Sequence, residues 1–182
     1  MATVPANLTL VEVLQQMLHQ FSNIPGPLVR PNWQVNPPKR PDVTTNWIAF
    51  GIEGVTPDFS AYVGPDSKGN PIMQRNEELA LVVNFYGPAS YDNYGLVRDS
   101  FQLAQNRAEL LKANIVWAYD GQATHVPELI DEEWFDRWRV VFTLRRQIIR
   151  NYPVLTFVSA SGTIYANNPG NGVDTIPVTV EE

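Results

Sequence analysis

The sequence contains no cysteine, which excludes disulfide bonds, thiolate chemistry and cysteine-based zinc or iron–sulfur sites. It has only two histidines, His19 and His125, so few side chains can serve acid–base or metal chemistry near neutral pH. No apolar run approaches the roughly 20 residues of a membrane span. No basic segment precedes an apolar one at the start, so we expect no signal peptide. These absences favour a chain made in a cytosol, or one indifferent to redox state, with no membrane partner.

Charged residues are scarce as well. They make up 18% of the 182 residues, whereas apolar residues make up 44%, which is typical of a globular protein with a real core. The net charge of -6 argues against a protein that wraps DNA by neutralising phosphates. An acidic surface past which DNA moves without binding is compatible with this charge.

The most informative stretch runs from Trp134 to Arg150, WFDRWRVVFTLRRQIIR. Its period-two alternation favours one long β-strand over the competing helix. We expect a core-facing side made of Trp134, Trp138, Val140, Phe142, Leu144 and Ile148. We expect the opposite side to carry Phe135, Arg137, Arg139, Val141, Thr143 and Arg145. The arginines either form a solvated face balanced by nearby acids, with residues 128–133 as the first candidates, or meet another subunit.

Helical spacing marks the N-terminal segment from Leu10 to Phe21. Thr9 is its predicted N-cap, and Glu12 completes a capping box three residues later. Prolines 25 and 27 end this helix.

Residues 25–46 form a proline-rich linker that holds six of the fifteen prolines, at positions 25, 27, 31, 37, 38 and 41. Proline fixes φ and removes a backbone donor, so we expect an extended surface connector and no strand inside a sheet. Trp33 in this linker needs a pocket, either in this subunit or in a neighbour.

The remaining pattern predicts an α+β fold, with a mixed or antiparallel sheet of about five strands packed against helices. It includes the extended N-terminal linker, an exposed hairpin loop at 56–76, a loop at 120–133 and a C-terminal arm. The predicted strands are 47–54, 78–86, 115–119, 134–150 and 154–158, the last two as an antiparallel pair. We expect one domain over residues 1–164 and an extended arm over 165–182.

Catalytic patterns are weak. His125 with Glu128 and Asp131 could be an acid–base or metal cluster, but metal sites need ligands from rigid elements and these three share one loop. Ser159 and Ser161 lack a G-x-S-x-G setting, and the glycine-containing loops lack the ending of a phosphate-binding loop. We therefore expect no catalytic residue, cofactor or metal. A hydrolase using His125 and a DNA-binding protein using residues 137–150 are the alternatives.

Five stretches occur in an order that resembles tailed-phage neck terminator proteins, also called tail terminator or tail completion proteins. They are VRPNWQVNPPKRPDVTTNWIAFGI (29–52), MQRNEELALVVNFYGP (73–88), QNRAELLKANI (105–115), VPELIDEEWFDRWRVVFTLRR (126–146) and SASGTI (159–164). They cover most of the chain, and their order and combination carry the resemblance. The helix at 10–21 and the segment after residue 165 match least well.

The resemblance implies a non-enzymatic virion protein at the head–tail junction, assembled in the host cytoplasm. It implies a homo-oligomeric ring, taken as a hexamer, that caps the tail tube or sheath, joins it to the head connector and lets DNA pass through its lumen. A head-completion or stopper ring of the connector is the alternative. The subunit-interface candidates are Trp33, Lys39, Arg40, Arg137, Arg139, Arg145, Glu132 and Glu133.

Overall fold

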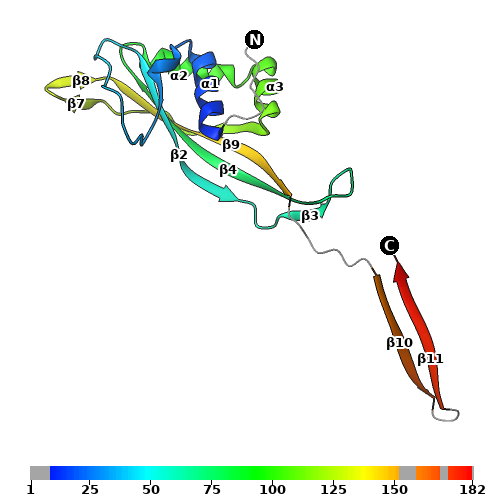
Figure 1. Ribbon diagram of the computed structural model, residues 1–182. Helices are drawn as coiled ribbons and strands as arrows, with labels where there is room; N and C mark the ends of the chain where they lie inside the picture. The colour runs from blue at the N-terminus through cyan, green and yellow to red at the C-terminus, as the bar shows by residue number, and fades with distance from the viewer. Residues whose placement is uncertain (1–8, 152–158, 169–171, 182) are drawn as a thin grey trace. The chain divides into compact units, whose positions relative to one another are not determined.

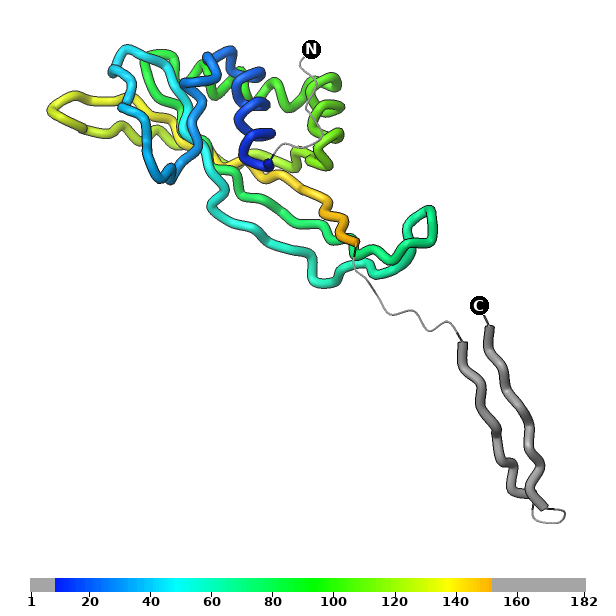
Figure 2. The backbone as a smooth tube through the Cα atoms, in the orientation of Figure 1, coloured from blue at the N-terminus to red at the C-terminus, as the bar shows by residue number. Residues whose placement is uncertain are grey.

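The computed structural model describes residues 9–151, 159–168 and 172–181. The chain divides into two compact units, one made of residues 1–63 and 73–150 and the other of residues 64–72 and 151–182. Figure 1 labels the helices and strands, and Figure 2 traces the backbone through them. None of the described helices is long and apolar enough to cross a membrane.

A mixed seven-stranded sheet forms the centre of the fold. Its main path runs β1-β2-β4-β9-β5, with β3 paired to β4 and β6 paired to β9. Strand β1 runs parallel to β2, whereas β2 with β4 and β5 with β9 are antiparallel. The bounds are β1 Val29–Pro31, β2 Trp47–Pro57, β3 Tyr62–Pro65, β4 Pro71–Tyr86, β5 Ile115–Asp120, β6 Thr124–His125 and β9 Arg137–Asn151. The predicted α+β class with a mixed sheet is confirmed.

Three α-helices lie on one side of this sheet, as Figures 1 and 2 show. They are α1 (Leu10–Ser22), α2 (Ser90–Ser100) and α3 (Ala104–Lys112), and a short 3-10 turn, η1, covers Gly26–Leu28. Helix α1 begins with the predicted capping box. The Thr9 hydroxyl accepts from the Glu12 backbone, and the Glu12 carboxylate accepts from the Thr9 backbone at 2.7 Å.

The hydrophobic core lies between the helices and the sheet, because each strand turns every second side chain toward the helices. Burial of such apolar surface is the main favourable term in folding. The largest fully buried side chains come from both the helical layer and the sheet: Leu14, Leu18, Ile48, Phe50, Leu79, Leu81, Phe85, Phe101, Ile115, Phe142 and Leu144. The alternation predicted for β9 is thus correct from Val140 to Leu144.

The predicted single strand from Trp134 to Arg150 is wrong at its start. It is two strands, β8 (Glu133–Phe135) and β9, separated at Asp136. The break reverses the predicted faces before it, since Phe135 is buried and Trp134 is 64% exposed. Its physical cause is that Asp136 bonds elsewhere: its carbonyl accepts from the Gly87 backbone at 3.1 Å, and its carboxylate contacts the start of α2.

Three segments expected to be irregular contain strands. The exposed hairpin loop at 56–76 includes the end of β2, all of β3 and the start of β4. The loop at 120–133 includes β6 and β7 (Glu128–Ile130), and β7 pairs with β8 in a two-stranded sheet of its own. The proline-rich linker includes β1, where Val29 pairs with Ile48 and Pro31 with Phe50. Strand β1 is the last strand on its side of the sheet, where a proline without an N–H is tolerated.

The C-terminal unit contains an antiparallel hairpin of β10 (Ser159–Asn168) and β11 (Gly172–Glu181). Its register runs from Ser159 opposite Glu181 to Asn168 opposite Gly172. The predicted strand at 154–158 lies outside the described residues. Strand β10 runs through residue 164, where the sequence-based division between domain and arm was placed, and that division stays a prediction.

Candidate subunit-interface surface

The arginines of β9 on the sheet face turned away from the helices have acidic partners from β2 and β4. Arg139 donates through Nη2 to both oxygens of Glu53, at 2.8 and 2.6 Å. Arg145 donates through Nε and Nη2 to Glu78 Oε1, at 2.9 and 2.6 Å, and this hydrogen bond together with the carboxylate charge raises the pKa of Arg145. These cross-strand pairs neutralise the arginine face within the subunit.

The acids expected to match these arginines supply only one partner. Glu128 pairs with Arg137, whose Nε also donates to the Val126 carbonyl at 3.0 Å. Glu53 and Glu78 were missed because they lie 86 and 67 residues from their arginines in the chain. Their positions in strands next to a basic strand were the available signal. Arg137, Arg139 and Arg145 are each paired with an acid of the same subunit, and their contact with another subunit stays a prediction.

Trp33 lies in the linker with a φ of 57° and is 73% exposed. The ring rests against Gly51 of β2, where an added Cβ would come within 2.6 Å of a ring carbon. Within this subunit Trp33 therefore contacts β2 at Gly51 with most of its indole exposed, and a pocket in a neighbour stays a prediction. Gly51 permits this close approach because it has no side chain.

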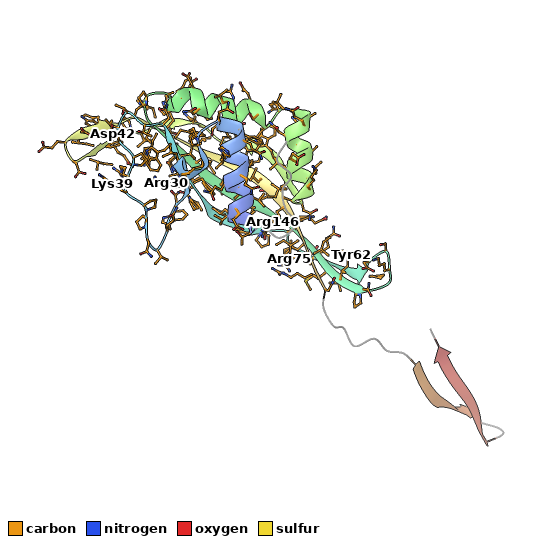
Figure 3. The ribbon with its side chains drawn as sticks, turned by 45° about the horizontal axis from the view of Figure 1, so that its top comes forward. Arg30, Lys39, Asp42, Tyr62, Arg75 and Arg146 are labelled. Carbon is orange, nitrogen blue, oxygen red and sulfur yellow. The ribbon has the colours of Figure 1, made fainter. Side chains whose placement is uncertain are left out.

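Lys39 and Arg40 follow in the same linker, and both are exposed. Arg30 fixes the linker here, because its Nη1 donates to the Lys39 carbonyl at 2.8 Å. The Arg40 guanidinium lies over the Phe135 ring, 5.1 Å from its centroid. Figure 3 shows Arg30, Lys39 and Asp42 in the same part of the molecule. Within the described residues, none of Arg30, Lys39 and Arg40 forms a salt bridge.

The β7–β8 hairpin carries Glu132 and Glu133 and ends in a two-residue turn. Asp131 and Glu132 have φ values of 50° and 68°, the left-handed values that a type I′ turn requires. Glu132 and Glu133 are both exposed, and neither has a salt-bridge partner among the described residues. Behind the turn, Leu129 and Trp134 are register partners and are 57% and 64% exposed.

His125, Asp136 and Ser90 form a cluster that superficially suggests catalysis. The Ser90 hydroxyl donates to Asp136 Oδ2 at 2.7 Å, and His125 Nε2 is hydrogen-bonded to Asp136 Oδ1. Partial burial opposes ionisation of Asp136, but the bonds with Ser90 and His125 outweigh it and lower its pKa. In a Ser-His-Asp triad the histidine stands between the other two groups, whereas here the carboxylate does. The cluster instead ties the first residue of α2 to the β8–β9 junction.

The proposed cluster of His125, Glu128 and Asp131 does not form. His125 bonds Asp136, Glu128 pairs with Arg137, and Asp131 lies in the hairpin turn. Across the described part of the chain, no group of three or more histidine and acidic side chains is placed to hold a metal ion.

A model of the family described as phage neck terminator protein matches residues 9–168. This range contains α1, the whole helix-and-sheet unit described above up to Arg150, and strand β10. All five stretches that carried the sequence resemblance fall inside it, and so does the N-terminal helix that had matched least well. A comparison with the curated proteins found no match.

Proposed function

The chain belongs to the phage neck terminator protein family, and from this premise we propose that its copies form a closed ring between phage head and tail. Family membership makes the chain a structural protein of the phage neck. In the proposal, the ring is a hexamer that caps the tail tube or sheath. It joins the tail to the head connector, and DNA passes through the ring. The subunit does this without catalysis or a cofactor.

The observation that carries the ring is the exposure of large apolar side chains on two separate parts of the subunit. Trp33 and Val35 in the linker are 73% and 96% exposed, and Leu129 and Trp134 in the β7–β8 hairpin are 57% and 64% exposed. Contiguous exposed apolar surface in a soluble protein marks interaction sites. A closed ring needs two different surfaces on each subunit, one for each neighbour. The hairpin is one such surface, and the linker is a further surface for contact with another subunit or neck protein.

Charged residues also divide into those paired within the subunit and those on the linker and hairpin surfaces. Arg137, Arg139 and Arg145 are paired inside the subunit, so we assign them the role of holding the sheet face on which the interface rests. Lys39 and Arg40 on the linker surface, and Glu132 and Glu133 on the hairpin surface, are the charges we assign to contacts with other subunits or neck proteins. The net charge of -6 supports a lumen that does not bind DNA tightly.

The test is native mass spectrometry of the purified full-length chain, followed by negative-stain imaging of the largest species. We expect closed rings with sixfold symmetry. Rings with twelvefold symmetry would favour a stopper in the connector instead. A chain that stays monomeric at every concentration, and forms no ring on isolated tails, contradicts the proposal.

A charge variant sharpens this test. Replacing Lys39 and Arg40 together by alanine should reduce ring formation while the subunit stays folded by circular dichroism. The matched control is Arg98→Ala, because Arg98 is an exposed arginine on α2 whose contacts are with Asp99 and the Tyr94 ring of the same helix. Equal ring formation by the double variant and the control would remove the linker charges from the interface.

A further inference from the structure

The β7–β8 hairpin has the features of an inserting element. Leu129 and Trp134 face each other across the two strands and form an exposed apolar pair. The turn beyond them carries three consecutive acids, Asp131, Glu132 and Glu133, with no salt-bridge partner among the described residues. The two positive φ values of this turn occur at residues other than glycine, which costs free energy and persists at functional sites.

A groove between α3 and β5 has the complementary features. It encloses about 210 Å³ and is lined by Leu110, Leu111, Ile115, Val116, Trp117 and Arg107. Leu111 and Val116 at its rim are 58% and 48% exposed. The Trp117 indole N–H is buried and lacks an acceptor within the described part of the chain. Such an orphaned donor requires an explanation, and a partner acceptor is one.

Arg107 supplies the charge at this groove. Its Nε donates to the Phe101 carbonyl at 3.0 Å and its Nη2 donates to Gln102 Oε1 at 2.7 Å. Both partners are neutral, and no described carboxylate forms a salt bridge with it. The groove therefore offers an apolar wall and an unneutralised guanidinium, while the hairpin offers an apolar pair and unneutralised carboxylates.

We propose that the β7–β8 hairpin of one copy inserts Leu129 and Trp134 into the α3–β5 groove of the next copy, with its turn acids meeting Arg107. This rests on the self-assembly proposed above and names the contact that makes it. Both surfaces belong to the same compact unit, and Figure 1 shows the hairpin and α3 at opposite ends of it. A contact between unlike, distant surfaces is heterologous and repeats from subunit to subunit until the ring closes. Tryptophan and arginine at its centre are the residues that most often dominate protein interfaces.

The absence of native cysteine makes the contact directly testable by disulfide trapping. Single-cysteine chains carry Leu129→Cys in one preparation and Leu111→Cys or Val116→Cys in the other. All three positions are exposed, so the substitutions leave the core intact. The two preparations are mixed under assembling conditions and oxidised, and covalent dimers are counted on a denaturing gel. The control pairs Leu129→Cys with Leu96→Cys, an exposed position on α2. A third mixture pairs Leu129→Cys with Val35→Cys and tests the linker as the competing site for the hairpin.

We expect covalent dimers from the groove pairs and only a background level from the Leu96→Cys control and from the competing Val35→Cys mixture. A strong product with Val35→Cys, or no groove product above background while native mass spectrometry still shows rings, overturns the groove contact and leaves the ring standing. If the wild-type chain forms no oligomer at all, both the ring and the contact are overturned.

A second measurement separates insertion from charge attraction alone. Trp134→Ala should abolish the groove product, and Trp134→Phe should retain part of it, because an aromatic ring still fills the site. Replacing Glu132 and Glu133 together by glutamine should lower the yield and make it less dependent on salt. A groove product unchanged by Trp134→Ala would overturn insertion of the tryptophan.

Discussion

The two faces of the central sheet carry different kinds of side chain. The face beneath the helices is filled by buried aliphatic and aromatic side chains such as Phe50, Phe85 and Phe142. The opposite face is held by long charged pairs, including Arg139 with Glu53 and Arg145 with Glu78. Burial of apolar side chains on the first face stabilises the subunit fold. The second combines charge pairs at the surface, which contribute little to stability, with a smaller buried cluster of Trp47, Ala49 and Tyr86. Exposed apolar side chains also occur outside these two faces, in the linker at Trp33 and Val35 and in the β7–β8 hairpin at Leu129 and Trp134.

Removing a buried aromatic side chain from the helix-covered face should have the largest effect on the stability of the subunit. Phe142 is fully buried and lies 5.1 Å from Phe101, measured between ring centroids. Phe142→Ala should lower the free energy of unfolding by about 3–5 kcal/mol, because it removes buried apolar surface and leaves a cavity. Urea denaturation of the monomeric chain measures this. A loss below about 1 kcal/mol would show that this face does not carry the fold.

Removing the hydrogen bonds of the Asp136 carboxylate should lower the free energy of unfolding by less. Asp136→Ala leaves the buried Ser90 hydroxyl without its carboxylate acceptor, for an expected loss of about 1–3 kcal/mol. The contribution should also depend on pH. The folded pKa of Asp136 is lowered, so its contribution is present above the unfolded pKa and is lost as pH falls through the folded value.

Urea denaturation between pH 6 and pH 2, on the wild type and Asp136→Asn, checks this pH dependence. The stability difference between the two should shrink toward zero at the acid end. The control is Asp99→Asn, which changes an exposed acid paired with Arg98. A difference between wild type and Asp136→Asn that stays constant over this range would contradict the assignment.

Breaking a charge pair on the helix-free face should have a still smaller effect. A double-mutant cycle on Arg139→Ala and Glu53→Ala should give a coupling energy of about 0.2–1 kcal/mol that falls as salt rises. The side chains of both residues are about two-fifths exposed, at 39% and 40%, so solvent screens the pair. A coupling above about 2 kcal/mol would mean that this face contributes to the fold in the way that the buried face does.

Trp134→Ala should have the smallest effect on the subunit and a large one on assembly. Trp134 is 64% exposed, so its loss should change the free energy of unfolding by less than about 0.5 kcal/mol. Native mass spectrometry of the same preparation should show loss of rings. A destabilised monomer would mean that Trp134 contributes to the subunit fold. Rings formed as in the wild type would mean that Trp134 does not contribute to assembly.

Local signals in the sequence predicted the elements that depend on nearby residues. The capping box of α1 involves Thr9 and Glu12, three residues apart, and its geometry follows from their types. The alternation from Val140 to Leu144 gave the buried face of β9 because strand periodicity is set by the backbone. The family was also recognisable from the order of short stretches along the chain.

The features that were missed depend on partners distant in sequence. The break at Asp136 arises from bonds to Gly87 and Ser90, more than 40 residues earlier. The β7–β8 turn uses Asp131 and Glu132 in place of the Asn-Gly or Asp-Gly pair that usually marks such a turn. The partners of Arg139 and Arg145 become adjacent only when β2, β4 and β9 align in the sheet. Sequence periodicity holds no information on these alignments.

The most direct test of the central claim is a cryo-EM reconstruction of the neck in the assembled phage particle. We expect a ring of this chain between the head connector and the tail, with the helix-covered cores separate and the β7–β8 hairpin of each subunit in contact with the next subunit. A neck that lacks this chain, or that contains it without a closed ring, would contradict the account.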